Sequence, residues 1–297
     1  LGERVIGICD TPIGLVNRTL NALDIPEEER ADVSFDYAGL NHLGWLRSLS
    51  VGGRDVLPRL FADEAALGSM EESRAIGTDW IRTLGALPNE YLFYYYCHRE
   101  AMARIHQDQT RGEYLRDQQE AFYNAVLAGP EQAGRTWIDA LADREATYMA
   151  EARDVDERSG RRAEDIAGGG YQKVALDLMN ALATNTPARM ILNVGNGDGG
   201  FSSIPTLRDT DVVEVPCDVN ASGVHPIPVA PLSGAALGLV QSVKACENLV
   251  IDAARERDRS LAWQALALHP LVDSVNVARD VLDQAIRTNP LVAAAFD

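Results

Sequence analysis

The sequence is poor in several residue types that mark particular classes of protein. Aromatic residues make up 6% of the 297 residues, and there are only four cysteines and five histidines. Four widely spaced cysteines in so long a chain are not a disulfide framework. Such usage is typical of a reducing compartment, so we expect a cytoplasmic protein in which any unusual cysteine acts as a thiolate.

Positive charge and long apolar runs are also scarce. Lys and Arg number 27 against 44 Asp and Glu, which gives a formal net charge of −17. Nucleic acids and anionic membranes attract basic surfaces, so neither is expected as a partner. No apolar run approaches the roughly 20 residues of a membrane-spanning helix. The 46% of hydrophobic residues is ordinary for a globular protein with a sizeable core.

The first forty residues predict a strand, a helix and a second strand. Residues 4–9 and 33–40 are apolar enough for buried strands, and apolar positions at helical spacing fall between them. Thr11 is the predicted N-cap of that helix, with Pro12 at its first position. Cys9 and His42 then follow the C-terminal ends of their strands, which is where α/β proteins tend to carry their chemistry.

Beyond this unit the pattern is mixed. Helices are expected over 71–152, with a break at Gly129, and again from 233 to the end, while 191–194 and 212–219 are expected to be strands. An exposed charged stretch is expected over 153–165. The glycine-rich run 195–200 has no βαβ unit with a downstream acid around it, so it is interpreted as a turn. Interleaved helices and short strands predict an α+β fold.

The pairs Cys9-Asp10 and Asn41-His42 form the first candidate site. A thiolate and an imidazole suit a divalent metal such as Mn, Fe, Co or Zn, and two protein ligands predict an open, catalytic type of site. Cys9 precedes a helix N-terminus, which is expected to lower its pKa. The alternative is that Cys9 is a small core residue and that His42 only caps a strand.

Tyr171 forms the second candidate site. It follows Gly168-Gly169-Gly170 at the start of a predicted helix, where the positive end of the helix dipole favours a phenolate that could act as a base. The alternative is a glycine-rich surface loop with a packing tyrosine. The aromatic run 87–96 could line a sugar site, although a buried helix or strand start is the commoner explanation.

Several of these segments, in this order, resemble glycoside hydrolase family 4. The matching segments are 6–12, 37–45, 87–96, 168–175, 193–196, 213–217 and 239–247. The family has an N-terminal Rossmann-type NAD domain and a catalytic C-terminal domain related to that of lactate and malate dehydrogenases. The resemblance implies that 1–297 is the catalytic, metal-binding α+β domain, with short and mainly antiparallel strands. It also implies that the NAD-binding domain is absent, and the opening of the chain inside a strand-like run agrees with this expectation.

The resemblance also implies roles for individual residues. Cys9 and His42 would bind the metal, most often Mn²⁺, and Tyr171 would be the base. Asp10 would be a general acid, and Asn41 would contact the substrate. The resemblance implies a redox-assisted elimination: hydride would leave C3 of the sugar for NAD⁺, the proton at C2 would be removed, and the aglycone would leave from C1. Water would then add and the hydride would return. This route differs from the two-carboxylate mechanism of most glycosidases.

The substrate subtype rests on conflicting residues. Asp10 favours a 6-phospho-α-glucosidase, whereas the longer strings 41–45 and 87–96 look more like a 6-phospho-β-glucosidase, which is the activity predicted here. An α-galactosidase or α-glucuronidase of the family is an alternative, as is a non-catalytic fragment that binds sugar phosphate or forms a dimer interface. Gln172 and Lys173 depart from the family pattern. The expected partners are a phosphorylated disaccharide or glucoside and further copies of the chain, as a homodimer or homotetramer.

Overall fold

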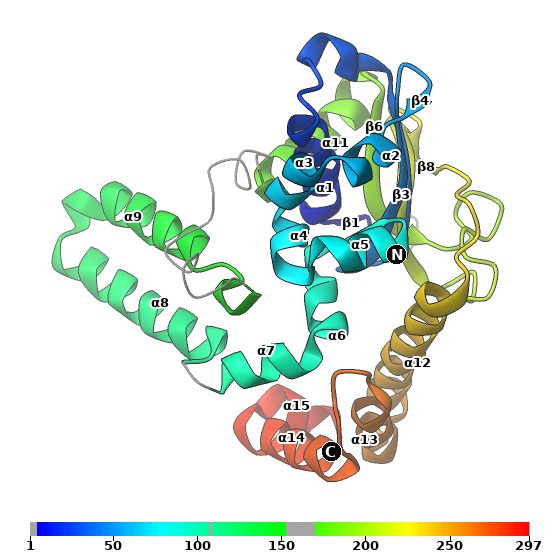
Figure 1. The fold of residues 1–297 in the computed structure, drawn as a ribbon. Coiled ribbons are helices and arrows are strands. Elements are labelled where there is room, and N and C mark those ends of the chain that lie inside the picture. Colours follow the sequence, from blue (N-terminus) through cyan, green and yellow to red (C-terminus); the bar gives the residue numbers. More distant parts are fainter. Residues whose placement is uncertain (1–4, 107–108, 153–169, 297) are drawn as a thin grey trace.

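An antiparallel sheet forms the centre of the molecule (Figure 1). The computed structural model describes residues 5–106, 109–152 and 170–296. All of the strand pairings described are antiparallel, which confirms the predicted α+β class. The strands, in their order across the sheet, are β1 (Gly7–Ile8), β6 (Ala188–Gly195), β7 (Val212–Asn220), β2 (Val33–Leu40), β3 (Leu43–Val51) and β4 (Arg54–Asp55), with β5 (Leu87–Pro88) paired to β3 and β8 (Gly223–Pro226) to β7.

Helices surround the sheet and extend from it (Figure 1). Those near the sheet are α1 (Thr11–Ala22), α2 (Leu57–Ala62), α3 (Glu64–Ser69), α4 (Glu71–Ile76), α5 (Thr78–Leu84) and α11 (Gly170–Thr184), together with the 3-10 turns η2 (Glu27–Asp32) and η3 (Glu90–Leu92). A projecting arm consists of α8 (Arg111–Ala128) and α9 (Ala133–Ala146), reached through α6 (Phe93–Tyr96) and α7 (His98–Ile105). The C-terminal helices are α12 (Gly234–Glu256), α13 (Arg259–Leu268), α14 (Val275–Thr288) and α15 (Pro290–Ala295). None of the described helices is both long and apolar enough to cross a membrane.

The predicted strand–helix–strand unit is present, with one correction: Asp10, not Thr11, is the N-cap of α1, and its side chain accepts no capping hydrogen bond. Cys9 follows the end of β1 and His42 lies just beyond the end of β2, as predicted. The two strands run in opposite directions, because β6 and β7 lie between them and each successive pairing is antiparallel. The predicted charged stretch 153–165 and two of the glycines before Tyr171 lie outside the described residues.

The glycine-rich run 195–200 links β6 to the chain that leads into β7, and no helix follows it, so the interpretation as a turn is confirmed. The side chain of Asn196 holds this segment together through hydrogen bonds to its backbone. Its side chain is fully buried, its amide donates to the carbonyl of Ile204 at 3.1 Å, and its carbonyl accepts from the amide of Ile204 at 2.7 Å.

A register row of small and polar residues crosses the sheet through its centre. Its members, from β1 to β3, are Gly7, Asn193, Glu214, Gly39 and Gly44. The hydroxyl of Tyr37 passes over Gly44 and donates to Glu214 Oε2 at 2.9 Å, and Asn193 donates to Glu214 Oε1 at 3.1 Å. The carboxyl group of Glu214 therefore joins β2, β6 and β7 inside the core.

We expect Gly44→Ala to destabilise the fold by roughly 1–3 kcal/mol, because a Cβ at this position would overlap the hydroxyl group of the buried Tyr37. The free energy of unfolding in denaturant measures the effect. Gly68→Ala is the matched control: Gly68 lies inside α3 with nothing within 4 Å of its Cβ position, so that variant should be neutral or more stable by up to about 1 kcal/mol. Equal stability of the two variants would contradict this packing.

Candidate functional site

Cys9 and Tyr171 are 162 residues apart in the sequence and meet in the structure. Cys9 follows β1 and is fully buried, and its Sγ lies 3.9 Å from the hydroxyl oxygen of Tyr171. Tyr171 is in the first turn of α11 and is 48% exposed, so its other side faces solvent. Gly170 precedes it with φ of 58°, and a Cβ on Gly170 would lie 3.7 Å from Asp10 Oδ2. The structure thus groups the predicted thiol, carboxylate and phenol.

His42 lies in the two-residue turn between β2 and β3 with φ of 63°, a left-handed conformation that is costly for a residue other than glycine. Its ring stacks on Tyr91, with centroids 4.0 Å apart and planes 9° apart. Burial lowers the pKa of His42, and the nearby charge of Asp10 acts in the opposite direction. The imidazole is therefore neutral at pH 7, as a metal ligand must be. Asn41 precedes it and is exposed.

The predicted pKa directions at Cys9 and Tyr171 are wrong. Burial raises the pKa of Cys9 to about 11, and the negative charge of Glu214 adds to this. Burial, followed by the charge of Cys9, raises the pKa of Tyr171 above its usual range. Desolvation outweighs the helix dipole because it penalises every charged form, whereas the dipole acts weakly and only over the first turn.

These surroundings fit a divalent cation. A buried thiol and a neutral imidazole are borderline-soft donors, and a cation would offset the negative charge that raises the pKa of Cys9. Among the described residues no three or more His, Cys, Asp or Glu side chains gather as a complete metal site. Cys9 and His42 would therefore leave coordination positions open for a ligand, as catalytic sites do.

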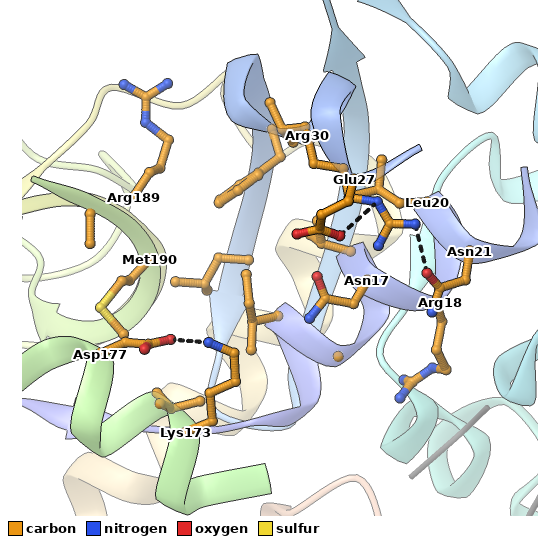
Figure 2. Close-up of a pocket in the computed structure, with 18 of the residues that line it drawn as sticks. Asn17, Arg18, Leu20, Asn21, Glu27, Arg30, Lys173, Asp177, Arg189 and Met190 are labelled. Atoms are coloured by element: carbon orange, nitrogen blue, oxygen red, sulfur yellow. Dashed lines mark hydrogen bonds and ion pairs between the residues drawn. The ribbon is translucent and has the colours of Figure 1, made fainter. Parts of the chain in front are cut away.

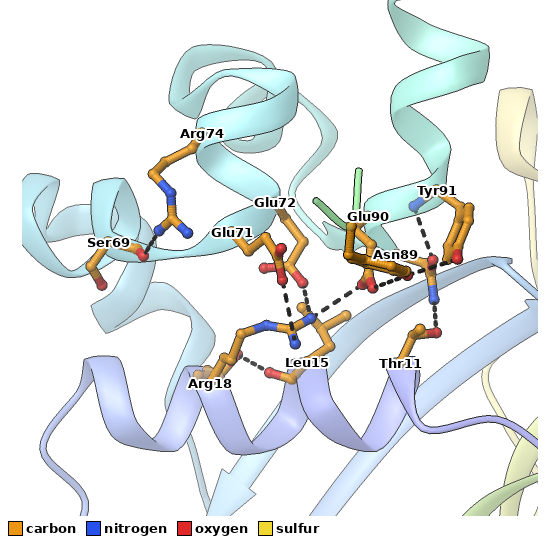
Figure 3. A network of polar contacts seen from close by, with 12 residues as sticks. Thr11, Leu15, Arg18, Ser69, Glu71, Glu72, Arg74, Asn89, Glu90 and Tyr91 are labelled. Atoms are coloured by element: carbon orange, nitrogen blue, oxygen red, sulfur yellow. Dashed lines mark hydrogen bonds and ion pairs between the residues drawn. The ribbon is translucent and has the colours of Figure 1, made fainter. Parts of the chain in front are cut away.

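A buried amide lies beside this group and was not predicted. Asn89, just before η3, is fully buried, and its Nδ2 donates to Thr11 Oγ1 at 2.7 Å (Figure 3). The hydroxyl of Thr11 lies 3.3 Å from the Sγ of Cys9. The sequence signal for Asn89 was the adjacent polar pair Asn89-Glu90 within the aromatic run 87–96, which by itself indicates only a turn.

Arg18 holds the same turn against α1 (Figure 3). Although it is charged, it is buried, and it forms ion pairs with Glu72, with Glu90 at 3.2 Å and with Glu71 at 3.9 Å. Burial raises the pKa of Glu90, and the positive charge of Arg18 opposes that shift. One cation thus links α1, α4 and η3 beside the candidate site.

Comparison with known proteins decides the family. The profile of the "Family 4 glycosyl hydrolase C-terminal domain" matches residues 37–272. The chain belongs to this family. The matched range contains Asn41, His42 and Tyr171, while Cys9 and Asp10 precede it.

Individual relatives match nearly the whole length of this chain. It is 27% identical to the maltose-6'-phosphate glucosidase MalH of Clostridium acetobutylicum, over 97% of this chain and 62% of that protein. It is 26% identical to the 6-phospho-beta-glucosidase BglT of Thermotoga maritima, over 97% of this chain and 61% of that protein. The chain therefore spans about three fifths of the length of these relatives.

Solved structures share the fold. A 6-phospho-beta-glucosidase of Thermotoga maritima, solved with NAD and glucose-6-phosphate, superposes with a TM-score of 0.71 at 25% identity, covering 98% of this chain and 61% of that one. A 6-phospho-alpha-glucosidase from gut microorganisms, solved with NAD and Mn²⁺, gives a TM-score of 0.69 at 23% identity, covering 98% and 62%.

A cavity of about 590 Å³ in this family 4 domain lies between α1 and η2 on one side and α11 and β6 on the other (Figure 2). None of the predicted site residues lines it. Two of its cations are compensated locally: Lys173 pairs with Asp177 at 2.6 Å, and Arg30 pairs with Glu27 at 3.6 Å. Since the cavity offers no group arranged for chemistry, we place the candidate site at Cys9, His42 and Tyr171.

The buried carboxyl group of Glu214 predicts a pH-dependent stability. Burial raises its pKa to about 7, against the hydrogen bonds from Tyr37 and Asn193. A folded pKa above the unfolded value means that its contribution is complete below the unfolded pKa of about 4.5 and is lost as the pH rises through about 7. We therefore expect the wild type to lose on the order of 2 kcal/mol between about pH 5 and pH 8 relative to Glu214→Gln.

Denaturant unfolding at a series of pH values measures this difference. Glu28→Gln is the matched control, because Glu28 is an exposed carboxylate in η2, and its profile should follow the wild type. Parallel profiles for the wild type and Glu214→Gln would contradict the assignment.

Proposed function

We propose that this chain forms the metal-binding and catalytic part of a 6-phosphoglucosidase that uses NAD⁺ and a divalent metal, Mn²⁺. The observation that carries the proposal is the contact between the buried thiol of Cys9 and the phenol of Tyr171 in a chain that belongs to family 4. The relatives' names and the NAD, Mn²⁺ and glucose-6-phosphate in the solved structures support it.

Cys9 and His42 would hold the metal, which when bound supplies a positive charge that stabilises an enediolate on the sugar. NAD⁺ would supply a reversible hydride acceptor and would be held by polypeptide other than these 297 residues. The domain assignment of 1–297 as the C-terminal part, without a Rossmann domain, belongs to this proposal. It agrees with the three fifths of the relatives' length that the chain spans.

The chain's own residues would then handle protons and orientation. Tyr171 would take the proton from C2 of the sugar, since its phenol has one side on Cys9 and the other open to solvent. A cation that neutralises Cys9 would remove one of the causes that raise the pKa of Tyr171. Asp10 would protonate the leaving oxygen, and the exposed Asn41 would hydrogen-bond a sugar hydroxyl.

The substrate's glycosidic linkage, α or β, distinguishes two branches of the family. We propose the 6-phospho-β-glucosidase activity on the strings 41–45 and 87–96. The 6-phospho-α-glucosidase is the second candidate, which is favoured by Asp10 directly after Cys9. Assays on α- and β-linked nitrophenyl glucosides, with and without a 6-phosphate, separate the two. We expect turnover of the β-linked 6-phosphate only, and preferential turnover of the α-linked compound would contradict the β assignment.

Tyr171→Phe should leave metal binding intact but abolish exchange of the C2 proton with solvent, because the variant lacks only the hydroxyl that accepts the proton. Proton exchange is followed by NMR in deuterated buffer, with the protein complete with its nucleotide-binding part. Cys9→Ala is the comparison variant and should lose metal binding as well as exchange. Exchange at the wild-type rate in Tyr171→Phe would exclude Tyr171 as the base.

A further inference from the structure

We propose that Asn89 and Thr11 are positioning residues that hold Cys9 and His42 in one geometry for a shared divalent cation. This inference rests on the proposed function, because it takes Cys9 and His42 as the metal ligands. It goes further in assigning a role to a turn of the chain that carries neither ligand, Asn89–Tyr91.

The sheet alone does not bring the two ligands together. β1, which leads to Cys9, and β2, which leads to His42, run antiparallel with two other strands between them. Some other part of the fold must therefore fix the thiol relative to the imidazole. The turn that follows β5 is in contact with both sides.

Asn89 has a single possible orientation. Its backbone N–H donates to the carbonyl of Gly44 at 2.9 Å, two residues after His42, and its Oδ1 accepts from the backbone N–H of Tyr91 at 3.1 Å. The side-chain nitrogen must then point to Thr11 Oγ1, 2.7 Å away. With this buried amide as its donor, the hydroxyl of Thr11 keeps its own proton to donate to Cys9 Sγ at 3.3 Å. A hydrogen bond donated to sulfur favours a ligating thiolate and sets its direction.

Tyr91 completes the connection on the imidazole side. Its backbone is held by Asn89, and its hydroxyl oxygen lies 2.7 Å from that of Tyr148. The ring has little freedom, so the parallel stacking at 4.0 Å also fixes the plane of His42. Residues that orient metal ligands in this way typically alter metal affinity 10- to 100-fold when they are replaced.

The ion pair of Arg18 with Glu90 anchors the same turn to α1, the helix whose first residue is Thr11 (Figure 3). Thr11, Asn89 and Tyr91 therefore belong to one connected unit that reaches from the thiol to the imidazole.

The test is titration of the reduced protein with Co²⁺ alone, followed by the absorption band that a thiolate–cobalt bond produces. Thr11→Val, which has the same shape but no hydroxyl, should weaken Co²⁺ binding by about 10- to 100-fold, and Thr11→Ser should restore it. Asn89→Ala should have the same effect as Thr11→Val. Tyr91→Leu should also weaken binding, while Tyr91→Phe, which keeps the stacked ring, should not.

Thr19→Val is the matched control. Thr19 is a buried residue of the same helix, and its hydroxyl donates to the backbone carbonyl of Leu15 at 2.8 Å. This variant should keep wild-type Co²⁺ affinity whatever its melting temperature, which separates positioning from general stability.

Wild-type Co²⁺ affinity in Thr11→Val would overturn the positioning role while leaving the metal site in place. A thiolate band that is missing from the wild type, or that persists in Cys9→Ala, would instead refute the metal assignment on which both proposals rest.

Discussion

The structure depends on one buried carboxyl group. Glu214 lies in the middle of the sheet and accepts hydrogen bonds from Tyr37 on β2 and Asn193 on β6, so it ties together strands that are far apart in the sequence. The bond to Tyr37 is possible only because Gly44 leaves room for the phenol. The turn that carries His42 is two residues from Gly44, and Cys9 is two residues from Gly7 in the same register row. The packing of this row thus fixes the strands that lead to both candidate ligands, while the turn at Asn89 connects the two sides.

Burial governs the electrostatics of the site. The thiol of Cys9 and the carboxyl of Glu214 both have raised pKa values because desolvation disfavours their charged forms. Arg18 is engaged with three glutamates on the other side of the turn at Asn89. A divalent cation is the simplest species that would favour the thiolate at Cys9 and at the same time ease deprotonation of Tyr171. These shifts support the proposal of metal-dependent chemistry over that of a free thiol.

Local patterns predicted the elements but not their arrangement. The apolar spacing of α1, the apolar run of β6 and the valine-rich run of β7 were sufficient to place those elements. The strand order could not be predicted, since it places β6, some 180 residues later, next to β1. The burial of Arg18 could not be predicted either, because its glutamate partners come from other elements. The helix dipole suggested a lowered pKa for Cys9, and only the folded environment showed that desolvation prevails.

The candidate site was predicted in part. Cys9, Asp10, His42 and Tyr171 were identified through a family resemblance. The structure groups Cys9, Asp10 and Tyr171, and it places His42 on Tyr91 and near enough to Asp10 for that charge to act on the imidazole, while the roles of all four stay predictions. Asn89 and Thr11 escaped notice because a buried amide and a hydroxyl have no distinctive spacing in sequence.

X-ray absorption at the manganese edge tests the central claim most directly. For the reduced protein loaded with Mn²⁺, the account predicts one sulfur and one imidazole nitrogen in the first coordination shell, with oxygen in the remaining positions, and loss of the sulfur in Cys9→Ser. A shell of oxygen atoms alone in the wild type would contradict it.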